Sequence, residues 1–404
     1  MKAHEDRRQT RRRAFIGAGG IVLIGMVLAA LLGVFLSIWA GLLLGLASLV
    51  AAWLYLSRPG GVPILVYHSV SPDASWLPWA NNTSVRPETF RSHLETLKRD
   101  GWTVISTMDF VASRLADISL GNRTVILHFD DGYLDNLIFA APILREFAMP
   151  ATIFASLDFI EPGSAIRASP SNQGPDAWTG YMTAEELRLM DADPLFDIEA
   201  HGVDHARVPV SEKPVAELND SNWRRHAPLA WAYDSENKAH WFEATTPPHP
   251  LRLGDTVPET DSALAGRWWR DGVSETDATY ESRVSSVLAL ARQGLEEILG
   301  RKVNVFAWPY DRSCPISVGA AKAAGFAAVT GGRGENRPHE DPTVLSRVHV
   351  HDRAFGGGPI WLESLALRAR VNSASGRLGW HLLVVLAARI RRRRFGRPGY
   401  GAVS

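Results

Sequence analysis

Two adjacent carboxylates, Asp130 and Asp131, stand where an apolar run ends in a glycine turn. The run, Thr124 to Phe129, is typical of a buried strand, and Gly132 marks the turn after it. Buried carboxylates are costly unless they are paired or bound to a cation, and two neighbours in one cleft shift each other's pKa. The pair therefore indicates a cation site, although Asp-Asp-Gly by itself is also common turn chemistry.

Two histidines, His201 and His205, could supply further ligands. Imidazoles four positions apart can share one divalent ion, although such pairs also occur by accident on surface helices. They follow the apolar segment 196–200, just as the carboxylates follow their own run. Active sites of parallel α/β folds are built at these strand ends. We therefore predict a metal site of one carboxylate and two imidazoles beside a free carboxylate. Zinc is the expected ion, because this ligand set leaves positions open for water and substrate.

A third strand-like segment, Val303 to Trp308, runs into Pro309-Tyr310-Asp311. The order of the three segments resembles the polysaccharide deacetylases of carbohydrate esterase family four, the NodB-like homology domain. The motifs of that family contain Phe-Asp-Asp-Gly, His-x-x-x-His, and Pro-Tyr or Pro-Phe. Ile64-Leu-Val-Tyr-His68 looks like the start of one branch of the family, and the resemblance extends over about residues 62–352.

The resemblance implies a role for each matching residue. Asp130 would be the catalytic base, and Asp131, His201 and His205 would be the metal ligands. In amide hydrolysis the metal polarises the carbonyl, Asp130 takes the proton of the attacking water, and a protonated histidine gives a proton to the departing amine. The backbone N–H of Tyr310 would stabilise the oxyanion. The expected substrate contacts are His68, Pro309 and Tyr310.

The general acid of the family is a late histidine, and two candidates, His349 and His351, share one face of a predicted strand. We favour His351, because it lies nearer the C-terminal end of the strand, and keep His349 as the alternative. The third motif departs from many relatives, since Phe306-Ala-Trp-Pro contains no arginine. The orienting partner of Asp130 is therefore left open. A non-catalytic membrane glycan-binding or assembly protein on a degenerate barrel stays as the alternative function.

Strand-like runs alternate with helical patterns through this region, which favours an α/β fold with a parallel sheet. One helix is marked at both ends, because Pro87 opens it and Gly101 stops it, while Phe90, Leu94 and Leu97 share a face. Together with the resemblance, this predicts a distorted, seven-stranded (β/α) barrel. The predicted strands are 64–67, 125–129, 151–155, 197–200, 303–308, 327–330 and 347–350.

A long insertion, about residues 209–280, separates the second motif from the third. It is rich in aromatic residues, and disordered segments are poor in them. We expect a folded lid or subsite wall in which Trp268 contacts the sugar. Packing of the insertion onto the barrel is the competing interpretation.

The N-terminus combines a basic segment, residues 1–13, with an uncharged stretch from Ala14 to Leu56 inside a predicted membrane segment, 14–57. One helical span needs about twenty residues, so the stretch predicts two spans, near 15–36 and 40–56. The arginines place the first end in the cytoplasm. The hairpin then returns the catalytic domain to that side. This predicts a multi-pass protein of the inner (plasma) membrane, with a periplasmic or extracellular catalytic domain as the alternative.

The C-terminal segment 360–404 is basic and partly amphipathic, because an apolar stretch at 378–388 runs into arginines between 389 and 394. Such a segment suits an anionic leaflet, and a loose basic tail is the competing interpretation. With both ends at the inner leaflet, we expect a hydrolase that removes an N-acetyl or N-formyl group from an amino sugar of a lipid-linked saccharide or membrane-associated glycan. The 43 basic and 43 acidic residues argue against a nucleic acid partner, and the sequence indicates no oligomeric state.

Overall fold

The centre of the molecule is a parallel sheet whose strands are hydrogen-bonded in one continuous path. The computed structural model describes residues 2–35, 37–57, 60–167, 175–233, 238–331 and 335–396. The additional strand β4 (Thr103–Val104) pairs with β5 outside the main path. The path consists, in order, of β14 (Val344–Leu345), β13 (Ala328–Thr330), β12 (Val305–Phe306), β7 (Phe196–Ala200), β6 (Ala151–Ala155), β5 (Thr124–Phe129), β1 (Ile64–Tyr67) and β15 (Val348–His349).

The two end strands of this path belong to one short stretch of chain. β14 pairs with β13, β15 pairs with β1, and only Ser346 and Arg347 separate them. The sheet therefore curls round until its two edges meet at the stretch 344–349, which we call the seam. The predicted α/β barrel is confirmed, and it has seven strands when β14 and β15 of the eight-strand path are counted as one.

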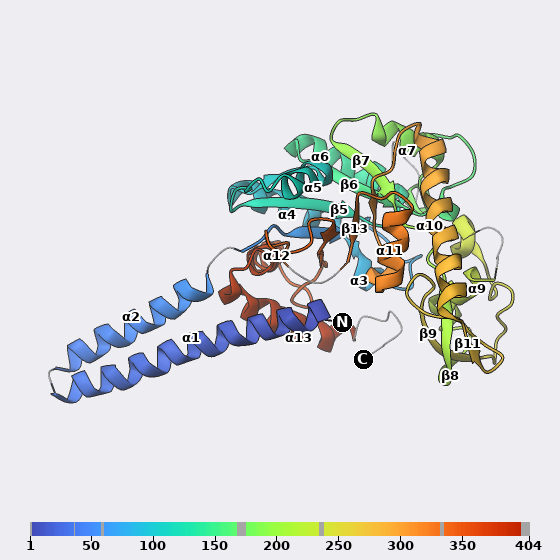
Figure 1. Ribbon diagram of the computed structural model, residues 1–404. Helices are drawn as coiled ribbons and strands as arrows, with labels where there is room; N and C mark the ends of the chain where they lie inside the picture. Colours follow the sequence, from blue (N-terminus) through green and yellow to red (C-terminus); the bar gives the residue numbers. More distant parts are fainter. Residues whose placement is uncertain are drawn as a thin grey trace.

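The strands are apolar on both faces, as parallel strands covered by helices must be. Every residue of β1, β5 and β6 is buried. In α4, Phe90, Leu94 and Leu97 are fully buried, and burying each such side chain contributes about 1.5–3 kcal/mol. The helices between the strands surround the sheet (Figure 1), and they are α4 (Pro87–Arg99), α5 (Thr107–Leu115), α6 (Ala141–Phe147), α7 (Ala184–Asp191), α10 (Asp277–Leu299) and α11 (Pro315–Ala323).

Short elements connect these parts near the open end of the sheet. The strands β2 (Ser69–Val70) and β3 (Ser84–Val85) pair with each other, and α3 (Ala80–Thr83) lies between them in the chain. The remaining short turns are the π-helix η1 (Asn136–Ala140) and the 3-10 helices η2 (Leu157–Phe159), η3 (Pro175–Trp178) and η5 (Pro309–Asp311).

The insertion is folded, and its framework is an antiparallel pair of strands. Two tryptophans connect it to the barrel side. Trp241 stacks on Trp79 with ring centroids 5.2 Å apart, and Trp231 meets Phe159 edge to face with centroids 4.9 Å apart. Its elements are β8 (Arg207–Glu217), α8 (Trp223–His226), α9 (Pro228–Trp231), η4 (Lys238–Glu243), β9 (Thr256–Ser262), β10 (Trp269–Arg270) and β11 (Val273–Ser274).

Two helices, α1 (Lys2–Phe35) and α2 (Ile38–Leu56), form a hairpin that extends away from the sheet (Figure 1). The Ser37 Oγ accepts a hydrogen bond from the Ala40 N–H and caps α2. The segments Arg11–Val34 and Ile38–Leu56 are long and apolar enough to cross a membrane, and their side chains are mostly exposed. The predicted spans, near 15–36 and 40–56, fall within these helices except for residue 36, which lies outside the described residues.

The C-terminal segment folds onto the barrel as α12 (Ile360–Ala374), η6 (Leu378–Trp380) and α13 (His381–Phe395), and residues 397–404 of the predicted tail lie outside the described residues. Arg391 is only 6% exposed and donates to the backbone oxygen of Asn81 and the side-chain oxygen of Asn82. On the opposite side of α13, Leu382, Leu386 and Ile390 repeat every four residues and are exposed. The helix is therefore amphipathic, with an apolar stripe that the described protein leaves uncovered.

Candidate active site

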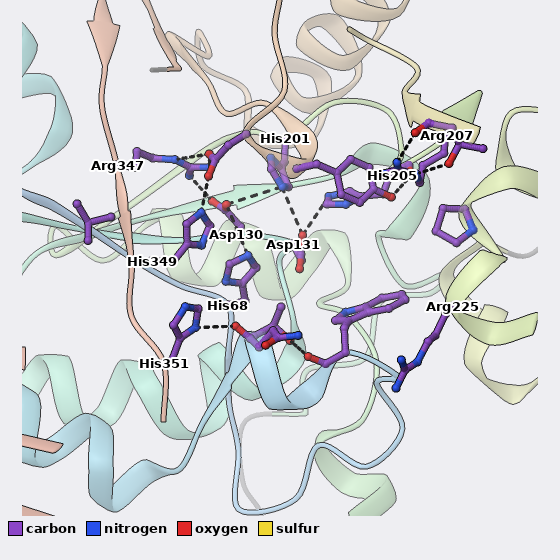
Figure 2. Close-up of a pocket in the computed structure, with 18 of the residues that line it drawn as sticks. His68, Asp130, Asp131, His201, His205, Arg207, Arg225, Arg347, His349 and His351 are labelled. Carbon is purple, nitrogen blue, oxygen red and sulfur yellow. Dashed lines mark hydrogen bonds and ion pairs between the residues drawn. The ribbon is translucent and has the colours of Figure 1, made fainter. Parts of the chain in front are cut away.

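The two adjacent carboxylates point in different directions because the chain turns sharply between them. Asp131 has a φ of 78° and Gly132 a φ of 68°. A Cβ at Gly132 would lie 3.3 Å from the Ala155 Cα, so the turn also passes close to β6. A left-handed non-glycine residue costs on the order of 1–3 kcal/mol. The turn directs the Asp130 side chain toward the seam and the Asp131 side chain toward the histidines (Figure 2).

Asp131, His201 and His205 converge on one point, and their ligand atoms lie within 4.8 Å of one another. The Asp131 Oδ1 is 3.4 Å from the His201 Nε2 and 3.0 Å from the His205 Nε2. The His201 Nδ1 lies 2.8 Å from the Ala307 carbonyl oxygen, so it carries the proton and leaves Nε2 as an acceptor. Tyr310 holds the second histidine, because its hydroxyl donates to the His205 carbonyl oxygen at 2.6 Å.

Two of these atoms fit a bound cation particularly well. The Asp131 Oδ1 and the His205 Nε2 are buried, and neither has a hydrogen-bond partner among the described residues. Burial raises the pKa of Asp131, but His205 and His201 outweigh it and hold the pKa well below its ordinary value. An ionised carboxylate between two imidazoles is a donor set that suits zinc. The residues present therefore fit the metal that the resemblance implies.

Asp130 is held by an arginine that sequence reasoning missed. The Arg347 Nη1 lies 2.6 Å from the Asp130 Oδ1, and the Arg347 Nη2 lies 2.6 Å from the Asp311 Oδ1. Burial raises the pKa of Asp130, but Arg347 and two nearby histidines outweigh it, so the pKa is lowered. Arg347 thus bridges two carboxylates from the seam, and it occupies the role that the third motif leaves open.

The seam also carries His349, whose Nε2 contacts the Asp311 Oδ2. Its ring stacks on His68 with centroids 5.4 Å apart, and the His68 Nε2 lies 3.9 Å from the Asp130 Oδ2. Burial lowers the pKa of His68 to about 4, although Asp131 and Asp130 raise it. His349 therefore lies beside the carboxylates of the site and contacts one of them, Asp311, directly.

The other candidate acid is His351, and the ring centroids of His349 and His351 are 6.4 Å apart. Its Nδ1 is 2.9 Å from the Asn82 carbonyl oxygen (Figure 2). Burial, followed by Arg370 and Arg391, places the pKa of His351 well below its ordinary value. The geometry therefore gives the alternative, His349, the better position for an acid.

A cavity of about 760 Å³ joins these groups. It is lined by His68, Tyr310 and the two candidate acids, His349 and His351. Aromatic side chains, among them Trp79 and Trp231, form another part of its wall. Pro309 is buried behind it, 3.7 Å from where a Cβ on Gly202 would lie. Trp268 is not among the residues that line this cavity. It packs instead against Tyr233 and under the Arg270 guanidinium, which lies 3.4 Å from its ring centroid.

The sequence carried one signal for the missed arginine. Arg347, His349 and His351 alternate along the chain, and side chains two apart share a face of a strand. Asp311 follows Tyr310 directly, and both have a positive φ, 52° and 61° respectively, which turns the aspartate toward the seam. The alternation was visible in the sequence, whereas the turn at Asp311 was not.

Comparison with known proteins gives matches of one kind. Residues 117–250 match the family model for polysaccharide deacetylase. A curated relative is YxkH of Bacillus subtilis (strain 168), whose name assigns it provisionally to the polysaccharide deacetylases. It is 28% identical over 155 residues, which are 38% of this chain and 47% of that protein. The chain thus spans about half the length of the curated relative that it matches.

Solved structures share the fold. A de-N-acetylase from Aggregatibacter actinomycetemcomitans superposes with a TM-score of 0.50 at 19% identity, covering 71% of this chain and 94% of that one. The deacetylase domain of BpsB from Bordetella bronchiseptica gives a TM-score of 0.49 at 22% identity, over 72% of this chain and 97% of that one. At this level of identity the likeness to the first structure concerns the fold alone.

Proposed function

We propose that the chain, whose residues 117–250 match the polysaccharide deacetylase family model, is a metal-dependent hydrolase that removes an N-acetyl or N-formyl group from an amino sugar. The observation that carries this proposal is the pairing of two buried carboxylates with different partners. Asp131 has the two imidazoles, and Asp130 has Arg347. One group is equipped to bind a cation, and the other to exchange a proton.

Asp131, His201 and His205 would hold one divalent ion, with zinc as the expected metal. When bound, such an ion polarises the acyl carbonyl and lowers the pKa of a water molecule. Asp130 would accept the proton of the water molecule that attacks the carbonyl carbon. Arg347 occupies the Oδ1 of Asp130, and the Oδ2 faces His68 and His201, so one oxygen is anchored and the other is directed into the cavity.

The leaving amine needs a proton before the carbon–nitrogen bond breaks. We assign this step to His349, because its ring lies beside the His68 ring and its Nε2 contacts the Asp311 carboxylate, which orients it. His351 was the first candidate from the sequence, but its contact with the Asn82 carbonyl turns it toward a different wall of the cavity. The products are the free amino sugar and the carboxylic acid, and the backbone N–H of Tyr310 remains the proposed donor to the oxyanion.

We further propose that the protein is anchored in the inner membrane by α1 and α2, with the catalytic domain on the cytoplasmic side. The hairpin supports this, because two crossings return the chain to the side of Arg11, Arg12 and Arg13. The exposed apolar stripe of α13, which is flanked by arginines, supports contact of the same side with the leaflet. The substrate would then be a lipid-linked saccharide or a membrane-associated glycan.

The test is to incubate metal-loaded full-length protein with membrane lipid extracts and to search by mass spectrometry for a sugar lipid that loses an acetyl or formyl mass. Asp130→Asn protein is the control. A species that disappears with the wild type and persists with the variant supports the proposal. A wild-type protein that binds metal but alters no amino sugar in the extract or in acetylated oligosaccharides would favour the alternative, a glycan-binding protein on this barrel.

A further inference from the structure

One part of the cavity wall is basic and contains no acid. Arg370 of α12 lines the cavity, and one of its N–H groups donates to the His349 carbonyl oxygen. No ion pair joins Arg370 to any carboxylate of the residues that the structure describes. Burial and the nearby Arg391 lower the pKa of Arg370 to about 10. A guanidinium held away from water beside a second one is stabilised by an anion.

Other groups beside Arg370 share its character. His351 and His381 line the same cavity, and Ser373 adds a hydroxyl that lies 3.2 Å from the His381 Nδ1. The acids of the cavity are engaged elsewhere: Asp130 and Asp311 bind Arg347, and Asp131 faces the metal ligands. On the insertion side, Glu259 lines the wall together with Arg207 and Arg225, so the charge there is mixed.

The position of this cluster relates it to both the reaction centre and the hairpin. His351 is one ring beyond the proposed acid, with a separation of 6.4 Å from His349, so an anion here would lie next to a sugar whose amide reaches the metal ligands. The same cavity extends to Arg11, where the first candidate span begins, and to Val384 of the amphipathic α13. An anionic group at Arg370 therefore lies between the sugar and the helices that are suited to a membrane.

We propose that Arg370, with His351, His381 and Ser373, forms a phosphate subsite, and that the substrate is an amino sugar joined through phosphate to a lipid. This deepens the proposed function and rests on it for the sugar, but not for the phosphate. Arg370 supplies planar, charge-assisted hydrogen bonds to phosphate oxygens. The lipid chain leaves the cavity past Arg11 and α13, toward the bilayer.

The test separates phosphate binding from catalysis. Full-length His201→Ala protein in nanodiscs lacks a complete metal site, so a phosphate cannot bind through the metal, and binding of a short-chain prenyl monophosphate is measured by calorimetry. Adding Arg370→Gln should weaken binding about tenfold or more, because it removes the charge-assisted hydrogen bonds to the phosphate. Arg370→Lys, which keeps the charge, should fall between the two.

The matched control is Arg368→Gln on the same helix, which removes an ion pair with Asp100 outside the cavity and should leave binding unchanged. Thermal unfolding checks that each variant is folded. Equal affinity of folded Arg370→Gln and its parent for prenyl monophosphate would overturn the phosphate subsite. Inorganic phosphate that binds as tightly as the prenyl monophosphate would overturn the lipid linkage. Because no turnover is measured, neither result depends on whether the protein proves to be a deacetylase.

Discussion

At the scale of residues, the backbone turn at Asp131 separates the carboxylate proposed to bind a metal from the carboxylate proposed to exchange a proton. Its positive φ sends two neighbouring carboxylates toward different partners. Desolvation acts on both, and opposite charges outweigh it at both, so each stays ionised. The partners of Asp131 lead to a prediction about metal binding, and the partners of Asp130 lead to a prediction about turnover. The two predictions can be measured separately.

The first prediction concerns the metal. Purified protein should hold about one divalent ion per chain, and His201→Ala should release it, because three ligands are needed to offset the cost of the buried charge. Elemental analysis of dialysed protein provides the measurement. His226→Ala is the matched control, since this histidine lines the cavity but is not one of the three ligands. Full occupancy in His201→Ala protein would remove the assignment.

The second prediction concerns the base. Asp130→Asn should keep the metal and the fold while kcat falls by roughly a hundredfold or more, which is the usual contribution of a general base. Arg347→Gln should also lower kcat, with a smaller change in KM, because it frees Asp130 without touching a metal ligand. Steady-state kinetics on the substrate found in the lipid extracts tests both. Near-normal turnover of the Asp130→Asn enzyme would move the base elsewhere.

At the scale of elements, the sequence predicted the strands that are continuous apolar runs and missed features that have no such pattern. The buried strands β1, β5, β6 and β7 were predicted within one residue of their observed ends, because continuous apolar runs are specific for covered parallel strands. The long strand β8 was not predicted, since Pro209 and Pro214 argue against a strand unless it lies at an edge. In the seam, the predicted strand 347–350 covers β15 alone, and β14, which pairs with a different neighbour, was not predicted.

The third prediction concerns the pH dependence of stability at the junction of β2 and η1, which Asp135 connects through hydrogen bonds. The Ser69 Oγ donates to its Oδ2 at 2.6 Å, and the Val70 N–H and the Asn136 amide donate to its Oδ1. Burial raises the pKa of Asp135 to about 7, although these hydrogen bonds lower it. The folded state therefore holds this proton more tightly than the unfolded chain does, for which the pKa is 3.8.

The stability that this proton contributes is fully present below the unfolded pKa and is lost as the pH rises through about 7. The free energy of unfolding of the wild type, relative to that of Asp135→Asn, should therefore decrease as the pH rises from 5 to 8. The change approaches about 1.4 kcal/mol per pH unit at most. Asp109→Asn, on the exposed start of α5, is the control and should show no such trend in this range. A constant difference between wild type and Asp135→Asn would contradict the prediction.

At the scale of the whole molecule, the hairpin and the C-terminal helices meet the barrel on one side. The indole nitrogen of Trp53 in α2 lies 3.5 Å from where a Cβ on Gly379 would be, and Arg11 pairs with Glu335. The hairpin is thus fixed to the catalytic domain by contacts at the ends of both helices. Arg11, at which the first apolar span begins, also lines the cavity.

The fourth prediction is topological. In a chain made free of native cysteine by Cys314→Ser, a reporter cysteine at exposed Ser274 should resist a membrane-impermeant thiol reagent in intact cells and react after lysis. A cysteine at Ser37, between the two helices, should react in intact cells and serves as the control. Labelling at position 274 in unbroken cells would place the catalytic domain outside and remove the argument for a cytoplasmic substrate.

The seam has a consequence for the order in which activity arises during synthesis. Arg347, which pairs with Asp130, directly precedes β15, the last strand to leave the ribosome, whereas β1, the strand that pairs with β15, is the first. Contacts between such distant parts of the chain form late, because loop closure must come before them. A nascent chain can thus assemble the Asp131 and histidine ligands while Asp130 still lacks its arginine. With the proposed roles, the chain would be able to bind its metal before Asp130 is in place to act as a base. An unfinished chain at the membrane would therefore not hydrolyse the substrate.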